Sequence, residues 1–426
     1  MAGDTLIIEG TAGRRVINGS IRVNGSKNDA VQAIAAAFLF KNGLTLTNLP
    51  QIDDMQKMLA LAGNLGCQVA VGRNKATIKA PRLLSRATLD IALAEKIRAS
   101  ILLTGPLLAR YGSVTFPHPG GCVIGERPID FFLAGFRQLG ASVRLQSGSY
   151  VVSAPGRGLR GGTIFFKNQS VTATETFLMA ATLTRGRTIL KNCALEPEIE
   201  NLGRFLRRAG ARISGLGTPT LIITGRDLLI ARRPYRVLPD RIEAGSFAIL
   251  GALLAKKLLI THCRPEHLEA LLTLLMELGV GVKSHGQTII VSAPPVGLRA
   301  VKIKTHEYPG FPTDLQAPLA VLLTQATGAS VILETIFEGR LNYAKNLMSM
   351  GAKIKILDPH RLTIIGPGSL TGRPVTSPDL RAGLAYLLAG LIAKGRTVVH
   401  NVQYIDRGYE QIDERLRTLG LALKRF

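Results

Sequence analysis

One pattern of apolar and polar positions recurs six times along the chain. In each copy an amphipathic stretch ends at a glycine, and a short strand of alternating apolar and polar residues follows, as in residues 141–145. Glycine just after the last helical residue is typical of a helix C-terminus, where the backbone turns into the left-handed region. The six glycines lie about 70 residues apart. They are Gly66, Gly140, Gly210, Gly279, Gly351 and Gly420.

Each copy also contains a second helical stretch, which is apolar on nearly all sides. A helix without a polar face is buried on all sides in a soluble protein. Each unit of about 70 residues is therefore expected to hold two helices and roughly four short strands, with one of the helices inside. The expected buried helices span residues 30–41, 95–110, 172–184, 243–256, 314–326 and 379–393.

Six such units exceed what one hydrophobic core supports, so three plus three predicts two similar domains. The predicted fold class is α/β, with two inside-out α/β domains, each of three repeated βαβαββ-type units with buried central helices. We expect one domain to span residues 22–238 and the other to combine 1–21 with 239–426, with a hinge at 234–241. A ligand site in the cleft between the two domains is then expected.

The chain is strongly basic, with 53 Lys and Arg against 29 Asp and Glu and a formal net charge of +24. Such a balance favours anionic partners. The basic residues are spread along the chain and form no tail. This distribution favours small anionic substrates over nucleic acid, and ordinary solvated basic side chains account for the rest of the surplus.

Cysteine usage and hydropathy indicate an intracellular protein. The four cysteines are widely spaced, which suggests neither a disulfide framework nor a zinc site. The longest apolar run, residues 315–333, is interrupted by polar residues and a proline, so no membrane span is expected. The N-terminus has no signal-peptide pattern. The predicted localisation is therefore cytoplasmic.

Cations stand in loops that precede several helices, where capping does not explain them. Ser, Thr and Asp cap helix N-termini, but Lys and Arg are disfavoured there by the helix dipole. An isolated arginine is usually a surface charge, whereas several at matching positions indicate a binding site for a carboxylate or phosphate. The residues concerned are Lys27, Arg98, Arg340, Arg381 and Arg407.

One further loop, residues 117–128, places Cys122 among glycines and prolines and five residues before Arg127. A thiol in such a loop near a fixed positive charge can hold thiolate character and react. The alternative is a small apolar side chain in a turn. No motif for a dinucleotide, a P-loop, a serine hydrolase or a zinc protease is present, and the histidines do not cluster.

Eight motifs in the same order make the chain similar, from end to end, to the UDP-N-acetylglucosamine 1-carboxyvinyltransferases of the enolpyruvyl transferase family. The motifs are Ser26-Lys27-Asn28, Arg98-Ala99-Ser100, 119–125 with Arg127-Pro128, 196–199, 238–243, 311–316, 379–382 and 405–410. The resemblance implies transfer of an enolpyruvyl group from phosphoenolpyruvate to the 3-hydroxyl of UDP-N-acetylglucosamine, by addition and elimination. This reaction is the first committed step of peptidoglycan synthesis.

The resemblance also implies a role for each matching residue. Lys27, Arg127 and Arg407 would hold the phosphate of phosphoenolpyruvate, Arg340 and Arg381 its carboxylate, and Arg98 would help neutralise the site. Asp314 would be the base on the sugar hydroxyl. Cys122 would act as the acid or assist product release, with a possible covalent phosphoenolpyruvate adduct and alkylation by fosfomycin. The residues expected along the UDP-sugar are Asn28, Arg98, Arg127, Pro128, Ile129, Asp130, Phe131, Asn168, Gln169, Ser170, Val171, Asp314 and Ile336; Asn28 is also expected at phosphoenolpyruvate.

No cofactor and no metal are implied, and the expected partners are the two small substrates, without nucleic acid. The expected assembly is a monomer.

Some positions depart from the family. Asn168 stands where Lys is common, Thr172 where Gly is common, and Asp29 where Ala is usual, while Glu126 adds a negative charge to the Cys122 loop.

Two alternatives remain open at this point. A sister enolpyruvyl transferase would use another nucleotide acceptor or shikimate 3-phosphate; the shikimate branch shares the fold but lacks the Cys122 loop. A protein that binds or processes RNA 3′-ends would suit the charge and similar repeats, but it would need a histidine nucleophile motif, and none is conspicuous.

Overall fold

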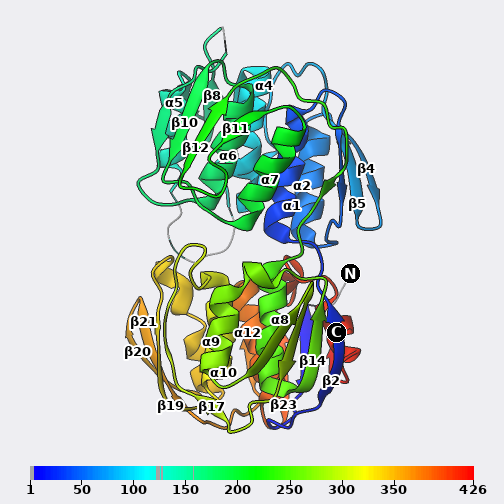
Figure 1. The fold of residues 1–426 in the computed structure, drawn as a ribbon, viewed down its shortest axis with the longest axis vertical. Helices are drawn as coiled ribbons and strands as arrows, with labels where there is room; N and C mark the ends of the chain where they lie inside the picture. Colours follow the sequence, from blue (N-terminus) through cyan, green and yellow to red (C-terminus); the bar gives the residue numbers. More distant parts are fainter. Residues whose placement is uncertain (1–3, 121–124, 126–127, 157) are drawn as a thin grey trace. The chain divides into compact units, whose positions relative to one another are not determined.

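The computed structural model describes residues 4–120, 125, 128–156 and 158–426 (Figure 1). The chain folds into two compact units. Of the described residues, unit 1 contains 4–24, 125 and 239–426, and unit 2 contains 25–120, 128–156 and 158–238. The chain therefore passes from one unit to the other between Asn24 and Gly25 and again between Leu238 and Pro239.

Unit 2 is built from three sheets around buried helices. Its sheets have the strand orders β13-β3-β5-β4, β6-β8-β7 and β11-β12-β10-β9. The helices, with η for 3₁₀, are α1 (Lys27–Ala36), η1 (Ala37–Leu39), α2 (Asp53–Asn64), α3 (Ile91–Ala94), η2 (Arg98–Leu103), α4 (Thr104–Tyr111), α5 (Asp130–Gln138), α6 (Val171–Leu183) and α7 (Pro197–Arg208). The strands are β3 (Leu44–Thr47), β4 (Gln68–Gly72), β5 (Lys75–Lys79), β6 (Ser113–Pro117), β7 (Ser142–Gln146), β8 (Ser149–Ser153), β9 (Thr163–Phe165), β10 (Arg187–Lys191), β11 (Arg212–Ser214), β12 (Thr220–Thr224) and β13 (Tyr235–Arg236).

Unit 1 repeats this plan, with sheets β22-β23-β1-β24, β15-β16-β14-β2 and β17-β19-β21-β20, and with β18 added beside β19. Its helices are α8 (Arg241–Leu254), η3 (Pro265–His267), α9 (Glu269–Glu277), η4 (Thr313–Leu315), α10 (Gln316–Leu323), η5 (Glu338–Leu341), α11 (Ala344–Ser349), α12 (Leu380–Ile392), α13 (Gln403–Asp406) and α14 (Ile412–Arg417). Its strands are β1 (Thr5–Glu9), β2 (Ile17–Arg22), β14 (Ala255–Thr261), β15 (Gly281–His285), β16 (Thr288–Ser292), β17 (Leu298–Arg299), β18 (Lys302–Lys304), β19 (Ala326–Leu333), β20 (Lys353–Asp358), β21 (Arg361–Gly366), β22 (Pro374–Thr376), β23 (Arg396–His400) and β24 (Leu423–Arg425).

Most sheets combine an antiparallel hairpin with one parallel edge strand. In the third sheet of unit 2, β10 runs antiparallel to β12, with Ile189 opposite Ile222, and parallel to β9. The two N-terminal strands complete unit 1: β1 lies antiparallel between β23 and β24, and β2 runs parallel to β14. Residues from both ends of the chain therefore share the core of unit 1.

The sixfold repeat and the α/β fold class are confirmed. All six predicted helix-terminal glycines have positive φ, from 80° at Gly66 to 107° at Gly210. This backbone region strains residues with a Cβ, so glycine is the suitable residue at these sites. The expected buried helices correspond to α1, α4, α6, α8, α10 and α12, each extended in some cases by a 3₁₀ turn.

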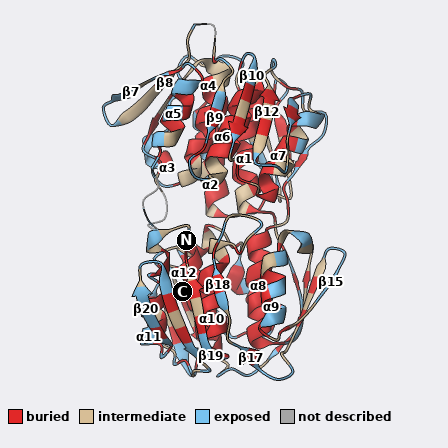
Figure 2. Cartoon of the chain, turned by 60° about the vertical axis from the view of Figure 1, so that its left-hand side comes forward, coloured by how far each residue is buried: buried red, intermediate tan, exposed pale blue. Residues whose placement is uncertain are grey.

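The central helices are buried because they carry almost no polar face. Every residue of α8 and of α12 is buried. Figure 2 shows buried positions concentrated on these central helices, with exposed positions on the outer strands and helices. Burial of an apolar side chain stabilises a fold by about 1.5–3 kcal/mol, so the inner helices supply much of each core.

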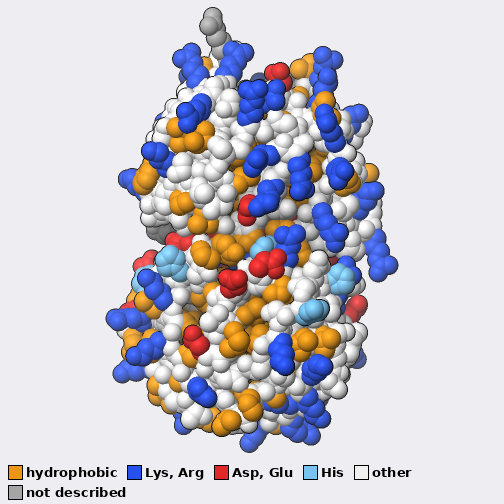
Figure 3. Space-filling model, in the orientation of Figure 1, with side chains coloured by type: hydrophobic (Ala, Val, Ile, Leu, Met, Phe, Trp, Pro, Cys, Tyr) orange, Lys and Arg blue, Asp and Glu red, His pale blue; other side chains and the backbone are white. Residues whose placement is uncertain are grey.

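Figure 3 shows lysine and arginine side chains scattered over the visible face of each unit, without a single continuous patch. Within the described part of the chain, no helix has the length and apolar character that crossing a membrane requires.

Unit 2 buries a group of carboxyls between α1, α6 and α7. Asp29 and Glu175 are 0% and 2% exposed. Asp29 accepts hydrogen bonds from Tyr235 Oη and from the backbone N of Leu238 at 2.7 Å. Burial raises the pKa of Asp29 to about 7 against the opposing effect of these donors. Burial also raises the pKa of Glu175 well above its usual value, and the neighbouring Glu198 adds to the effect.

Glu175→Gln is expected to make unit 2 relatively more stable as pH rises. Because the folded pKa of Glu175 exceeds its unfolded value of about 4.5, its stabilising contribution is complete below that pH and is lost as pH rises toward the folded pKa. Glutamine does not titrate. The free energy of unfolding of the variant, relative to that of the unmodified protein, should therefore increase by up to about 1.4 kcal/mol per pH unit. Denaturant unfolding at pH 5, 6.5 and 8 measures this difference.

The matched control is Glu200→Gln on α7, where the carboxylate pairs with Arg204 at the surface. This variant should follow the unmodified protein at all three pH values. A constant difference between Glu175→Gln and the unmodified protein across the series would contradict the assignment of a raised pKa to Glu175.

Candidate active site

Three of the predicted site residues meet in unit 1. Asp314 lies between the guanidinium groups of Arg340 and Arg381, and each arginine contacts a different carboxylate oxygen. The Arg381 Nη2 to Asp314 Oδ2 distance is 2.6 Å. The side chains of Arg340 and Arg381 are 5% and 8% exposed, whereas that of Asp314 is 27% exposed. Two nearly buried arginines thus face a carboxylate that solvent can still reach.

Local structure explains how each of these residues is presented. Asp314 lies in η4, the short turn that leads into the buried helix α10. Arg340 lies in η5, which follows β19 after a short loop. Arg381 lies in the first turn of α12, whose N-cap residue Asp379 accepts from the backbone N of Arg381 at 2.8 Å. The trio therefore joins three segments that are well separated in sequence.

The electrostatics of the trio keep Asp314 ionised. Burial by itself would raise the pKa of this carboxyl, but Arg381 and Arg340 outweigh it and hold the pKa below its usual range. Burial also opposes the charge of Arg381, yet Asp314 raises the pKa of that guanidinium further. A carboxylate so strongly held is a weak base until the arginines release it.

Arg381 also joins the loop that carries Arg407. Its Nη1 donates to Tyr409 Oη at 3.0 Å, and the hydroxyl of Ser246 lies 2.9 Å from the same oxygen. Tyr409 is 1% exposed, and burial raises its pKa to about 12. Arg407, at the end of α13, is 9% exposed and lies two residues before Tyr409. Arg407, the third candidate cation of unit 1, therefore lies close in sequence to a residue that contacts Arg381.

Sequence reasoning missed Glu334, which follows β19 and is completely buried. One of its carboxylate oxygens accepts from the backbone N of Ile336 at 2.8 Å, and the other accepts from Thr313 Oγ1 at 2.8 Å. Glu334 therefore ties the loop before Arg340 to the turn that carries Asp314. Ile336, expected at the UDP-sugar, lies in this loop. A lone glutamate between a strand and a loop gives no signal in the sequence.

The remaining candidate cations lie in unit 2. Lys27 begins α1, and its ammonium pairs with the buried carboxylate of Asp54 at 2.5 Å. Ser26 caps this helix through the backbone N of Asp29, and Asn28 follows Lys27 in the first turn. A Cβ at Gly25 would lie 1.8 Å from the carbonyl oxygen of residue 48, so only glycine allows the chain to enter the helix here.

Arg98 bridges the two described ends of the loop that contains Cys122. Its guanidinium donates to the carbonyl oxygens of Pro119 at 3.4 Å and of Pro128 at 3.3 Å. The sequence resemblance assigned Arg98 to the substrates and gave no hint of this contact. Cys122 and Arg127 themselves lie outside the described residues, so their predicted roles remain predictions.

The residues expected along the UDP-sugar lie at the starts of two helices in unit 2. Residues 128–131 lead into α5, and residues 168–171 lead into α6, where Ser170 caps the helix by accepting from the backbone N of Ala173 at 3.3 Å. The ring of Phe177 packs against both Phe132 on α5 and Phe166 before the second loop, with centroid distances of 6.3 and 6.0 Å. The N-terminal ends of helices α5 and α6 are therefore connected through one cluster of packed aromatic side chains.

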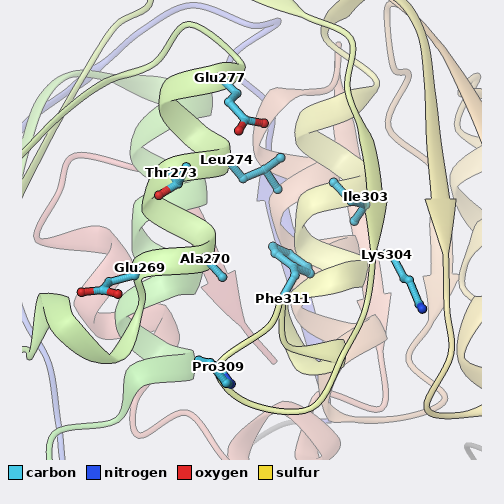
Figure 4. A pocket seen from close by; sticks show the side chains of 9 residues that line it. All are labelled: Glu269, Ala270, Thr273, Leu274, Glu277, Ile303, Lys304, Pro309 and Phe311. Carbon is cyan, nitrogen blue, oxygen red and sulfur yellow. The ribbon is translucent and has the colours of Figure 1, made fainter.

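A hollow of about 410 Å³ lies along α9 in unit 1 (Figure 4). Its lining comes from α9, from β18 and from the loop that follows β18, and none of the candidate site residues belongs to it. The lining residues are Glu269, Ala270, Thr273, Leu274, Glu277, Ile303, Lys304, Pro309 and Phe311. The candidate active site is therefore identified by its charged side chains and not by this hollow.

The sequence as a whole matches a known protein family. The family model of EPSP synthase (3-phosphoshikimate 1-carboxyvinyltransferase) matches residues 11–416. The chain therefore belongs to this family of enolpyruvyl transferases, as the sequence motifs predicted.

Individual relatives place the chain more closely within the family. It is 43% identical to the UDP-N-acetylglucosamine 1-carboxyvinyltransferase of Koribacter versatilis, over 96% of this chain and 94% of the relative. It is 42% identical to the protein of the same name from Nitratiruptor sp., over 99% of both chains. Among solved structures, the enolpyruvyl transferase NikO from Streptomyces tendae matches with a TM-score of 0.87 and 27% identity, over 100% of this chain and 99% of NikO. EPSP synthase from Acinetobacter baumannii matches over 99% of both chains with a TM-score of 0.74 and 18% identity, which shows a shared fold.

Proposed function

We propose that the protein transfers the enolpyruvyl group of phosphoenolpyruvate to the 3-hydroxyl of UDP-N-acetylglucosamine and releases phosphate. The observation that carries this proposal is the pair of nearly buried arginines, Arg340 and Arg381, which together hold a carboxylate in unit 1. Phosphoenolpyruvate brings a carboxylate of the same kind. The relatives at 42–43% identity, which carry the name of this activity, support the choice of acceptor.

The proposed reaction needs one base, one acid and several fixed cations. The sugar oxygen forms a bond to C2 of phosphoenolpyruvate while its proton leaves to a base, and C3 receives a proton to become a methyl group. Loss of a proton from C3 and of phosphate from C2 then restores the double bond. In our proposal Asp314 takes the hydroxyl proton and Cys122 supplies the proton to C3 or assists product release. A positioned acid or base contributes typically 10²–10⁴-fold to the rate.

The contacts of Asp314 suggest how the base becomes active. Asp314 now occupies the two guanidinium groups that we assign to the substrate carboxylate. When phosphoenolpyruvate takes over this pair, Asp314 loses the contacts that hold its pKa below the usual range, and it becomes a better proton acceptor. Substrate binding and base activation are thereby one event.

Residues of both units take part in the proposed reaction. We assign the phosphate of phosphoenolpyruvate to Lys27, Arg127 and Arg407, with Arg98 as a further positive charge. Guanidinium groups suit phosphate and carboxylate because they donate two parallel hydrogen bonds. The UDP-sugar is assigned to the starts of α5 and α6 in unit 2, with Asn28 from the same unit and Ile336 from unit 1.

We further propose that the enzyme works without a cofactor, as a cytoplasmic monomer in peptidoglycan synthesis. Phosphoenolpyruvate is a substrate in this scheme. The adduct that the resemblance implies on Cys122 would be a covalent intermediate or side product of the same substrate.

Release of phosphate from phosphoenolpyruvate, followed with three acceptors, tests the proposed activity. We expect turnover with UDP-N-acetylglucosamine and rates at least 100-fold lower with shikimate 3-phosphate and with UMP, because a site built to pair a polar group discriminates strongly against substrates that leave it unpaired. Turnover with shikimate 3-phosphate or UMP, but not with the UDP-sugar, would reassign the acceptor within the family.

A further inference from the structure

Glu334 lies at the centre of the segments that present the candidate catalytic residues of unit 1. It directly follows β19, and its side chain is 0% exposed. Its backbone is fixed from the neighbouring hairpin: its N donates to the carbonyl oxygen of His360 at 2.7 Å, and its own carbonyl oxygen lies 2.9 Å from His360 Nδ1. The carboxylate is therefore held in one place by the sheet.

Four donors converge on this carboxylate from two segments. Oε1 accepts from the backbone N of Ile336 at 2.8 Å and of Phe337 at 3.1 Å. Oε2 accepts from Thr313 Oγ1 at 2.8 Å and from Gln316 Nε2 at 3.2 Å. A buried carboxylate is stable when such hydrogen bonds replace its lost hydration. Both oxygens of the Glu334 carboxylate therefore accept hydrogen bonds that hold the surrounding segments in place.

Each segment held by Glu334 carries one member of the Asp314–Arg340 pair. Thr313 and Gln316 flank Asp314, and Phe337 lies three residues before Arg340, whose guanidinium is 5.6 Å from the Phe337 ring centroid. Arg340 in turn contacts Asp314. Glu334, the Asp314 turn and the Arg340 turn thus form a closed ring of contacts.

We propose that Glu334 is a positioning residue for the enolpyruvyl transfer, because it sets the place of Asp314 relative to Arg340 without touching substrate. The inference rests on the proposed function for its consequence in turnover. Its structural content, the joint positioning of the base and of one carboxylate-binding arginine, also predicts an effect on phosphoenolpyruvate binding alone.

The central test compares Glu334→Ala with Glu334→Gln in the full-length protein. Alanine removes all four acceptor contacts, and misplacement of catalytic groups by about 1 Å can cost on the order of 100-fold in rate. We expect this loss in kcat for Glu334→Ala, together with roughly tenfold weaker binding of phosphoenolpyruvate by calorimetry. Glutamine keeps one oxygen for the two peptide donors, and its amide can meet Thr313 or a rotated Gln316, so Glu334→Gln should recover to within about tenfold of the unmodified kcat.

The matched control is Glu9→Ala, which removes an acidic side chain of the same unit that pairs with Arg396 at the surface. This variant should keep both kcat and phosphoenolpyruvate affinity. A purely structural role for Glu334 would lower the melting temperature of Glu334→Ala while its folded fraction kept both quantities, and that result would overturn the inference. Equal losses in Glu334→Gln and Glu334→Ala would also overturn it.

Two single-donor variants keep the inference testable if Glu334→Ala does not fold. Thr313→Val and Gln316→Leu each remove one donor to Oε2, and each should weaken phosphoenolpyruvate binding severalfold; unchanged binding in both would overturn the inference. If the unmodified protein shows no transfer to any acceptor, the proposed function fails, whereas the binding measurements still decide the role of Glu334.

Discussion

Replacing Asp314 by alanine is expected to lower kcat by about 10²–10⁴-fold, the usual contribution of a positioned base, while phosphoenolpyruvate still binds. The structure adds a second expectation, which the sequence did not give. Because Asp314 occupies Arg340 and Arg381 in the absence of substrate, its removal frees both arginines for the substrate carboxylate. Phosphoenolpyruvate should therefore bind more tightly to Asp314→Ala than to the unmodified protein.

Steady-state phosphate release and calorimetric titration with phosphoenolpyruvate measure the two effects separately. Glu9→Gln, which removes a surface charge paired with Arg396 in the same unit, serves as the control and should change neither. Activity of Asp314→Ala within tenfold of the unmodified protein would reject Asp314 as the base. Weaker binding of phosphoenolpyruvate by this variant would reject the exchange of carboxylates while leaving the base role open to the kinetic result.

The fold was predictable because its determinants are local and repeated. A glycine at the end of a helix, such as Gly140 or Gly351, is required by its positive φ, and the same requirement recurs in every unit. The apolar character of α8 and α12 likewise predicted burial on all sides. Six repetitions of a weak signal made the architecture readable without knowledge of long-range contacts.

The pairings inside the site were not predictable from the same signals. Asp314 was expected to act on the sugar and Arg340 and Arg381 on phosphoenolpyruvate, yet in the structure they bind one another. When the fold brings oppositely charged side chains close together, they pair with each other in the absence of substrate. A list of residue roles states which groups a reaction needs, but it does not state which of them pair before the substrate arrives.

Buried polar residues with a structural role could not be predicted from the sequence either. Asp29 was noted only as a departure from the usual alanine, and in the structure it receives Tyr235 and the backbone N of Leu238, the last residue before the chain enters unit 1. Glu334 was not singled out at all. The partners of Asp29 lie far from it along the chain, and Thr313 is likewise distant from Glu334. The spacing and periodicity of apolar residues therefore do not predict these contacts.

Treatment with fosfomycin in the presence of UDP-N-acetylglucosamine is expected to label one thiol, that of Cys122, and to abolish turnover. The other three cysteines are structurally unsuited to react, because a thiol reacts as its thiolate and needs access to solvent. Cys67, Cys193 and Cys263 are 9%, 0% and 1% exposed. Burial raises the pKa of Cys67 and of Cys193 to about 12 and that of Cys263 to about 11.

The three buried cysteines therefore serve as an internal control for the labelling of Cys122. Intact-mass spectrometry should show a single adduct, and peptide mapping should place it on the segment that contains Cys122. Cys122→Ser should remove both the adduct and the sensitivity to the inhibitor, whereas Cys263→Ser should retain them, since the thiol of Cys263 is buried and its pKa is raised. An adduct on any of the three buried cysteines would exclude Cys122 as the selectively activated thiol. Complete resistance of the unmodified enzyme to labelling would remove the reason to assign Cys122 a part in proton transfer, and the acid of the addition step would then have to come from another residue.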